Sequence, residues 1–316
     1  MINFDYLQHA IFGLANAHRA GTMAGHLGAA VAAGYFFGED HSDLEDAVFR
    51  GVEGELDRVL AGEEAIWFNV KKTGIKPTDL FKAIPNGEVV ENANQAIVEA
   101  LGKSVGGLRQ SGHNVIFASL AIRALRDHQE FATPMVVEGI CKLIKGFHGV
   151  SAGRGYYGKK AGWRRGQDVK LDSAQDFPAY RGIGEMVQIT LQEVIDSASV
   201  RRQGFGGLWH LINHAAGIVD LERSGFGVLA SKALSAHHLH VRLWRSLPDV
   251  EKELGKNEKA RCSPLEAEYW KGMLKRDQAR LTHRIKTMYG FQVIKEVNDR
   301  DQLEKEADAA FLYLMS

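Results

Sequence analysis

The sequence lacks an excess of charge of either sign. Among its 316 residues, 39 are Lys or Arg and 39 are Asp or Glu, so the formal net charge is zero. A protein that holds nucleic acid through its phosphates normally carries a basic excess, at least over the binding domain. We therefore expect no nucleic-acid partner.

Cysteines and long apolar runs are also scarce. Cys141 and Cys262 are the only cysteines and show no metal-type spacing, so we expect two free, buried thiols in a reducing compartment. The longest apolar stretch, 27–37, is too short to cross a bilayer. The first residues, MINFDYLQHAIFGL, have neither a basic n-region nor a small-residue cleavage site. These features predict a cytoplasmic protein with no membrane partner.

The alternation of apolar and polar residues that is typical of strands is almost missing. Apolar residues instead recur at helical spacing, for example at Leu44, Val48, Val52 and Leu56. Only GFQVIKEV, at 290–297, is compatible with a short strand. The pattern predicts an all-α protein of about a dozen helices in one domain, 1–316, arranged as an α/α-toroid-like or irregular helical array. It leaves the oligomeric state open.

Glycine and histidine, by contrast, are abundant, with 34 and 13 residues. Three segments, at 24–37, 111–125 and 207–221, each place a histidine near the start of a helix, ahead of small and apolar residues. The spacing between them is irregular, which excludes a tandem repeat. We expect the histidine-bearing ends of these helices to converge on one region, with small residues allowing the backbones to approach closely.

Two histidines in the stretch GGLWHLINHAAG lie on one helix face. His210 and His214 are four residues apart and could present two imidazoles to one metal ion or one substrate. No Glu follows His210, so the His-Glu-x-x-His signature of zinc proteases is absent. The alternative is that one ring donates to a backbone carbonyl while the other faces solvent.

Further histidines extend this set. In SAHHLHVRLW, His237 and His240 share a face and could join His210 and His214 as metal ligands. His113 falls in the first turn of a predicted helix, where the helix dipole favours a neutral imidazole able to act as ligand or base. His18 and His26 are eight residues apart, and a break at AGT, 20–22, would let them meet each other across a turn. For each of them, a hydrogen-bonded core histidine is the competing interpretation.

One segment, 149–177, lacks a helical stripe. It is rich in glycine, basic and aromatic side chains, which suit an anionic or flat ligand. Its GRGYYG matches Gly-x-Gly-x-x-Gly, but the preceding residues look helical, so a dinucleotide-binding turn is not expected. We predict an ordered loop that closes over the histidine cavity; the alternative is a solvated basic surface. The expected substrate-binding residues are Tyr156, Tyr157, Trp163, Arg164 and Arg165.

The histidine-bearing segments resemble the questin-oxidase-like family of helical proteins. The matching pieces are AGHLGAAVAAGYF, GHNVIFASLAIRAL and LWHLINHAAGI, with AHHLHVRLWRSL as a fourth. A further histidine expected in the second piece is missing at the level of Ile116 and Phe117. The resemblance implies an all-helical oxidoreductase that acts on a flat aromatic or polyketide-like substrate.

These observations support three functional hypotheses. The first is an oxidoreductase-like enzyme for a small aromatic or anionic substrate, in which His26, His113, His210 and His214 line a cavity as general acids and bases or as ligands. Its cofactor would be a nicotinamide or one transition metal ion. The second is a metal-binding or metal-dependent protein built on His210 and His214. The third is a helical interaction scaffold whose histidines are structural.

Overall fold

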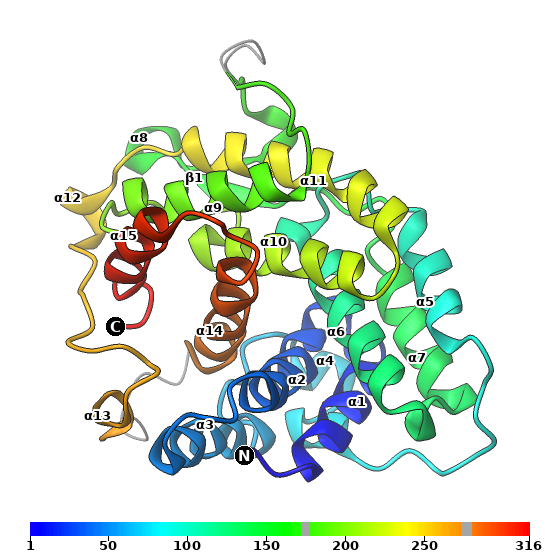
Figure 1. Ribbon diagram of the computed structural model, residues 1–316. Coiled ribbons are helices and arrows are strands. Elements are labelled where there is room, and N and C mark those ends of the chain that lie inside the picture. The colour runs from blue at the N-terminus through cyan, green and yellow to red at the C-terminus, as the bar shows by residue number, and fades with distance from the viewer. Residues whose placement is uncertain (172–176, 273–279) are drawn as a thin grey trace. The chain divides into compact units, whose positions relative to one another are not determined.

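The computed structural model describes residues 1–171, 177–272 and 280–316 (Figure 1). Within these residues the chain forms 15 α-helices and one sheet of two short strands, so the protein is all-α, as the sequence predicts. Residues 172–176, which belong to the loop expected at 149–177, and residues 273–279 lie outside the described residues.

The chain divides into two compact units, each made of three separate segments. The first unit comprises Met1–Lys103, Ile116–His148 and Cys262–Tyr289. The second unit comprises Ser104–Val115, Gly149–Arg261 and Gly290–Ser316. Each unit is described by itself below. The single domain and the toroid-like array expected from the sequence stay predictions.

Helices of the first unit pack closely through glycines. An added Cβ at Gly28 would lie 2.4 Å from the backbone nitrogen of Leu14, and one at Gly139 would lie 2.3 Å from the carbonyl oxygen of Ala15. Only glycine permits these approaches. The helices concerned, and those packed against them, are α1 (Asp5–Ala17), α2 (Gly25–Asp40), α3 (Asp46–Leu60), α5 (Ala93–Gly102) and α7 (Pro134–Lys145).

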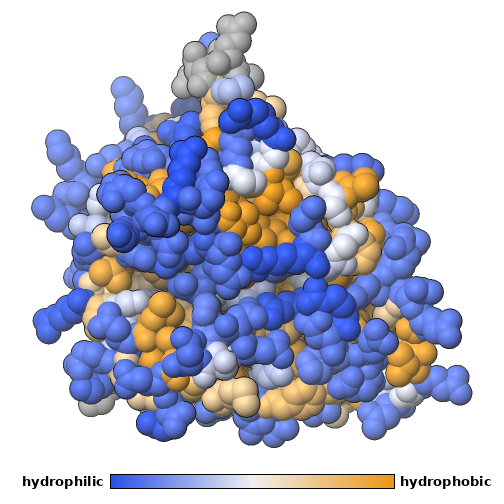
Figure 2. All heavy atoms as spheres, in the orientation of Figure 1, coloured by the Kyte–Doolittle hydropathy of each residue, from blue (hydrophilic) through white to orange (hydrophobic). Residues whose placement is uncertain are grey.

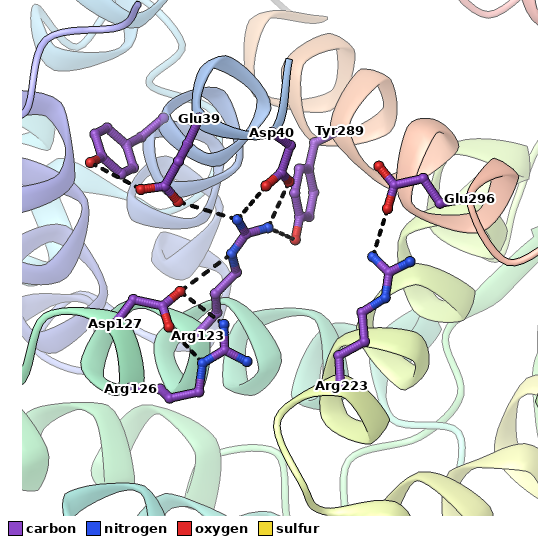
Figure 3. A network of polar contacts seen from close by, with 9 residues as sticks. Glu39, Asp40, Arg123, Arg126, Asp127, Arg223, Tyr289 and Glu296 are labelled. Carbon is purple, nitrogen blue, oxygen red and sulfur yellow. Dashed lines mark hydrogen bonds and ion pairs between the residues drawn. The ribbon is translucent and has the colours of Figure 1, made fainter. Parts of the chain in front are cut away.

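A polar network joins the end of α2 to two further helices of the first unit (Figure 3). Arg123 donates to Asp40, at 2.6 and 2.8 Å, and to the hydroxyl of Tyr289, at 3.1 Å. Its guanidinium also lies 4.1 Å over the ring of Phe36. The network therefore fixes the end of α2 against α6 (His113–Asp127) and the first part of α14 (Leu281–Lys295). The short helices α4 (Val70–Thr73) and α13 (Ala267–Trp270) complete this unit.

The second unit is built on α10, which packs against two other long helices. Its helices are α8 (Gly158–Ala161), α9 (Ile183–Ser197), α10 (Gly207–Arg223), α11 (Gly227–Arg245), α12 (Glu251–Leu254) and α15 (Asp301–Phe311). Helix α10 contacts α9 and α11 and the short 3₁₀ turn Gln110–Gly112. An ion pair between Arg223 and Glu296, at 2.9 Å, joins the end of α10 to the chain after α14 (Figure 3).

Two local expectations differ from the structure. Residues 290–295 continue α14, so the short strand that the sequence left possible at 290–297 does not form. The reason is tertiary packing, since the Phe291 ring stacks on Phe311 at 3.9 Å and Gly290 lies against Asn213. Within the expected loop, strands β1 (Arg154–Tyr156) and β2 (Trp163–Arg165) form an antiparallel hairpin that the sequence pattern does not reveal.

The described helices are all too short or too polar to cross a membrane. Polar and charged residues cover most of the face drawn in Figure 2, with apolar patches between them. In the described structure, neither cysteine forms a disulfide; Cys141 is buried, as expected, whereas Cys262 is half-buried.

Candidate functional site

Five buried histidines gather in the second unit, and we call them the histidine cluster. Each is at most 4% exposed. Two of them lie on α10 and two on α11, while the fifth follows directly after the 3₁₀ turn at 110–112. The members are His113, His210, His214, His237 and His240.

Glycines in left-handed backbone make room for these rings. Gly206, with φ of 76°, precedes α10, and an added Cβ there would lie 2.3 Å from Cγ of His210. Gly112, with φ of 86°, precedes His113, and an added Cβ there would lie 2.5 Å from Cγ of His214. Glycine is thus needed at both positions for conformation and for space.

The closest contact in the cluster joins His113 and His210. The Nδ1 atom of His210 bonds to the carbonyl oxygen of Gly206 at 2.7 Å, and Nδ1 of His113 bonds to that of Gln110. A carbonyl oxygen only accepts, so each Nδ1 carries a hydrogen and each neutral ring keeps its lone pair on Nε2. These two Nε2 atoms lie 3.0 Å apart. Two lone pairs at this distance repel unless a cation, a proton or a metal ion, lies between them.

His214 and His240 form a second pair. His240 donates from Nε2 to the carbonyl oxygen of Phe205 at 2.7 Å, which leaves its Nδ1 as an acceptor 3.4 Å from Nδ1 of His214. His214 therefore carries its hydrogen on Nδ1. Its Nε2 atom is buried and has no hydrogen-bond partner among the described residues.

His237 has both ring nitrogens engaged. It donates from Nε2 to the carbonyl oxygen of Leu211 at 3.1 Å and accepts at Nδ1 from the hydroxyl of Tyr180, also at 3.1 Å. Burial lowers the pKa of His237 to about 3 and that of His240 to about 4. Burial, and then the neighbouring imidazoles, also hold the pKa of His214 well below its ordinary value. Three members of the cluster are therefore neutral at neutral pH.

The expected loop begins beside His113. The backbone nitrogens of Gln110 and Ser111 donate to the carbonyl oxygens of Ser151 and Ala152, at 2.8 and 3.0 Å. Further along, Gly155 packs against Phe205, whose carbonyl oxygen holds His240. The first part of the loop is thus bonded to the backbone that carries the cluster.

The side chains expected to bind substrate lie further out on the hairpin. Tyr156 donates to Glu253, and the hydroxyls of Tyr157 and Ser246 share a hydrogen bond, each at 2.7 Å. Trp163 is 51% exposed. Arg164 lies 5.5 Å over the ring of Tyr157, and both Arg164 and Arg165 are exposed. Neither forms a side-chain hydrogen bond with the described residues, so their binding role stays a prediction.

His26, the remaining candidate, belongs to the first unit. Its ring stacks on Trp67 at 3.6 Å and donates from Nδ1 to the carbonyl oxygen of Met23 at 2.9 Å. Sequence reasoning missed the residues around it, namely Glu64, Trp67, His283 and Lys286. For His283 and Lys286, the signal that could have found them is LTHRIKTMYG, where charged residues interrupt an apolar helix stripe.

Within the second unit, the structure brings together four of the predicted metal-ligating residues, but in different pairs. His210 faces His113, and His214 faces His240. The carbonyl oxygens that fix these rings could not be predicted from the sequence. Comparison of the chain with models of protein families, with curated proteins and with solved structures gives no match.

Proposed function

We propose that the second unit binds one divalent transition-metal ion between Nε2 of His113 and Nε2 of His210, and that the protein is a metal-dependent enzyme for a small-molecule substrate. The observation that carries this proposal is the 3.0 Å contact between two nitrogens whose rings both donate from Nδ1 to carbonyl oxygens. A metal ion between them turns a repulsive contact into two coordinate bonds.

The distance between the two atoms suits such an ion. Imidazole nitrogens bind zinc at about 2.0–2.1 Å, so an ion equidistant from both atoms has an N–metal–N angle of roughly 95°. Neutral imidazole ligands are typical of zinc, iron, copper and nickel sites. Two protein ligands leave coordination positions open, and an open position for water or substrate distinguishes catalytic sites from closed structural ones.

The surroundings of the pair also favour a metal. Histidines that ligate metals almost always donate their other ring N–H to a carbonyl or carboxylate oxygen, which fixes the tautomer. Both His113 and His210 do so. The nearby imidazoles of His214, His237 and His240 are neutral because burial lowers their pKa, so they place no positive charge against the ion.

Metal analysis tests the proposal. Protein purified without chelator, or stripped and then incubated with zinc, is expected to hold about one ion per chain. His113→Gln and His210→Gln should each lose the ion. The control His238→Gln, on α11 and outside the pair, should retain it. Native protein that holds no metal and takes up none after zinc incubation would overturn the proposal.

One observation favours a second candidate function. The same pair of nitrogens could share a proton, as an imidazolium donating to an imidazole, and act as a general acid and base. This candidate predicts no stoichiometric metal and a strongly deshielded shared-proton resonance that disappears in His113→Gln. The oxidoreductase reaction and nicotinamide cofactor expected from the sequence, and a cytoplasmic location, stay predictions.

A further inference from the structure

Among the described residues, the first unit buries a lysine that forms no ion pair. Lys286, on α14, is 3% exposed, and its Nζ atom has no hydrogen-bond partner among the described residues. Its neighbour Arg284 differs, because it forms a buried ion pair with Glu55. A buried lysine whose ammonium group does not neutralise a carboxylate can serve as a nucleophile.

Two other polar groups near Lys286 also lack a partner. Glu64 is 1% exposed and accepts at one oxygen from the backbone nitrogen of Thr282, at 2.7 Å, but its Oε1 atom has no partner in the described structure. The buried Nε1 atom of Trp67 has none either. Unsatisfied buried polar groups are costly and rare, so an amine, a carboxyl group and an indole N–H together indicate a site completed by a ligand.

Aromatic rings surround the amine. Nζ of Lys286 lies 6.0 Å from the ring centre of Trp67 and 5.9 Å from that of Phe117. His26 stacks on Trp67 and lies with its ring centre 5.5 Å from that of Phe117. Two aromatic rings beside the amine suit a flat aromatic ligand.

The environment makes the amine nucleophilic. Burial lowers the pKa of Lys286 to about 7, and the charge of Glu64 offsets part of this effect. Burial raises the pKa of Glu64, opposed by its bond from Thr282 and by Lys286 and Arg284. The other titratable groups nearby are His26, His283 and the Glu55–Arg284 pair. Near neutral pH, a large share of Lys286 is therefore the free amine, unlike an ordinary lysine with a pKa of about 10.4.

We propose that Lys286 is a nucleophile that forms an imine with a small aromatic aldehyde or ketone. The amine nitrogen bonds to the carbonyl carbon, and the carbonyl oxygen leaves as water with the two hydrogens of the amine, so no oxidant or reductant is needed. Glu64 is the acid that protonates the departing oxygen and then recovers a proton from nitrogen. This site lies in the first unit and goes beyond the proposed metal function.

The ligand reaches the amine through the segment between α3 and α4. Trp67 is only half-buried, and its neighbour Ile66 is 63% exposed. Residues 61–69 lie between α3 and α4 and belong to no helix, so a displacement of Trp67 in this segment would open the site to solvent.

Reductive trapping with benzaldehyde and cyanoborohydride near pH 7 tests the proposal. Hydride converts an imine into a stable benzylamine, which peptide mass mapping locates. Lys286 is expected to be labelled at least tenfold faster than any exposed lysine, with a rate that reaches half its maximum near pH 7. Lys286→Arg should abolish the fast phase, and Lys142→Arg, an exposed residue of α7, should leave it unchanged.

The wild-type peptide map decides the question even if Lys286→Arg fails to fold. Labelling of Lys286 at the same rate as Lys142, or no labelling, would overturn the proposal. The fast phase should also persist after metal is removed with a chelator, because His113 and His210 take no part in the step. This result would support imine formation whether or not the second unit binds metal.

Discussion

Gly206 makes room for the His210 ring because it has no Cβ atom. Gly206 and Gly207 both have left-handed backbone, with φ of 76° and 68°. An added Cβ at Gly206 meets the His210 ring, whereas one at Gly207 meets no atom within 4 Å. The two residues therefore form a matched pair that separates backbone strain from displacement of the ring.

Gly207→Ala is expected to cost about 1 kcal/mol of unfolding free energy, from backbone strain alone, and to keep its metal affinity. Gly206→Ala should cost more and also weaken zinc binding at least tenfold, because its methyl group pushes His210 away from His113. Denaturant unfolding and zinc titration measure the two effects. Equal zinc affinity in both variants would show that the ring position does not matter for binding.

The buried histidines make stability depend on pH. The pKa values of His237, about 3, and His240, about 4, lie below the ordinary value of about 6.5, so the unfolded chain binds protons first as pH falls. Above about pH 6.5 these two rings are neutral in both states and do not make the free energy of unfolding depend on pH. Below it the free energy of unfolding falls, by up to about 1.4 kcal/mol per pH unit for each ring.

Urea unfolding between pH 7 and pH 5 should therefore show a smaller loss of stability in His240→Gln than in wild type, because one proton-binding group is removed. His238→Gln keeps both buried rings and should retain the wild-type slope. Parallel pH profiles for wild type and His240→Gln would contradict the assignment of a neutral, buried His240.

At this scale, the sequence identifies the histidines that lie together on α10, on α11 and beside the 3₁₀ turn better than it identifies how their rings pair. Helical spacing identifies residues that share a face of one helix, and it therefore places His210 and His214 together. It carries no information on the partner supplied by another segment, such as His113 for His210. The Gly206 carbonyl that orients His210 is also invisible in the sequence, because every residue has one.

At the scale of elements, an ion pair holds α11 against α9. Arg245 is 43% exposed and pairs with Glu193, whose side chain is 5% exposed. Arg245→Met should cost roughly 1–3 kcal/mol, because it leaves a buried carboxylate without its cation, and partial exposure of the arginine limits the effect.

Burial already raises the pKa of Glu193, and Arg245 opposes that rise. Without Arg245 the carboxyl group protonates more easily, so the deficit in unfolding free energy should shrink as pH falls towards 5. Arg165→Ala on β2, an exposed residue, should change stability by less than about 0.5 kcal/mol. A deficit of Arg245→Met that grows on acidification would contradict this account.

Helices were predictable from the sequence because apolar residues repeat over many turns, as in α3. The hairpin was not, since each strand has three residues and no alternation can be read over so short a run. At 290–297 the β-branched and aromatic residues are compatible with a strand, but residues 290–295 are helical and Phe291 stacks on Phe311. Tertiary packing outweighs the local preference for a strand in this segment.

At the scale of the whole molecule, zinc should protect one unit selectively. The proposed ligands belong to the second unit, and binding to the folded state slows local opening of the segments that carry them. Amide hydrogen exchange is expected to slow in 110–115 and 206–214, but not in α1 or α3. Equal protection of all helices would indicate a general effect of zinc instead of a defined site.

The division into two units could not be predicted from the sequence, because neither unit is continuous. Each is assembled from three segments, and α6 and α14 contribute residues to both. Composition does not change at these boundaries, so no linker signal marks them. Helical periodicity therefore gives the fold class, while the grouping of helices depends on contacts between segments far apart in the chain.

X-ray absorption at the metal edge of zinc-loaded protein tests the central claim most directly. The account predicts imidazole nitrogen scatterers at about 2.0–2.1 Å, two of them from His113 and His210. His238→Gln should give the same spectrum, whereas His113→Gln, which is expected to lose the ion, should leave no zinc in this two-imidazole environment. A spectrum without imidazole scatterers, or one that is identical in wild type and His113→Gln, would contradict the claim.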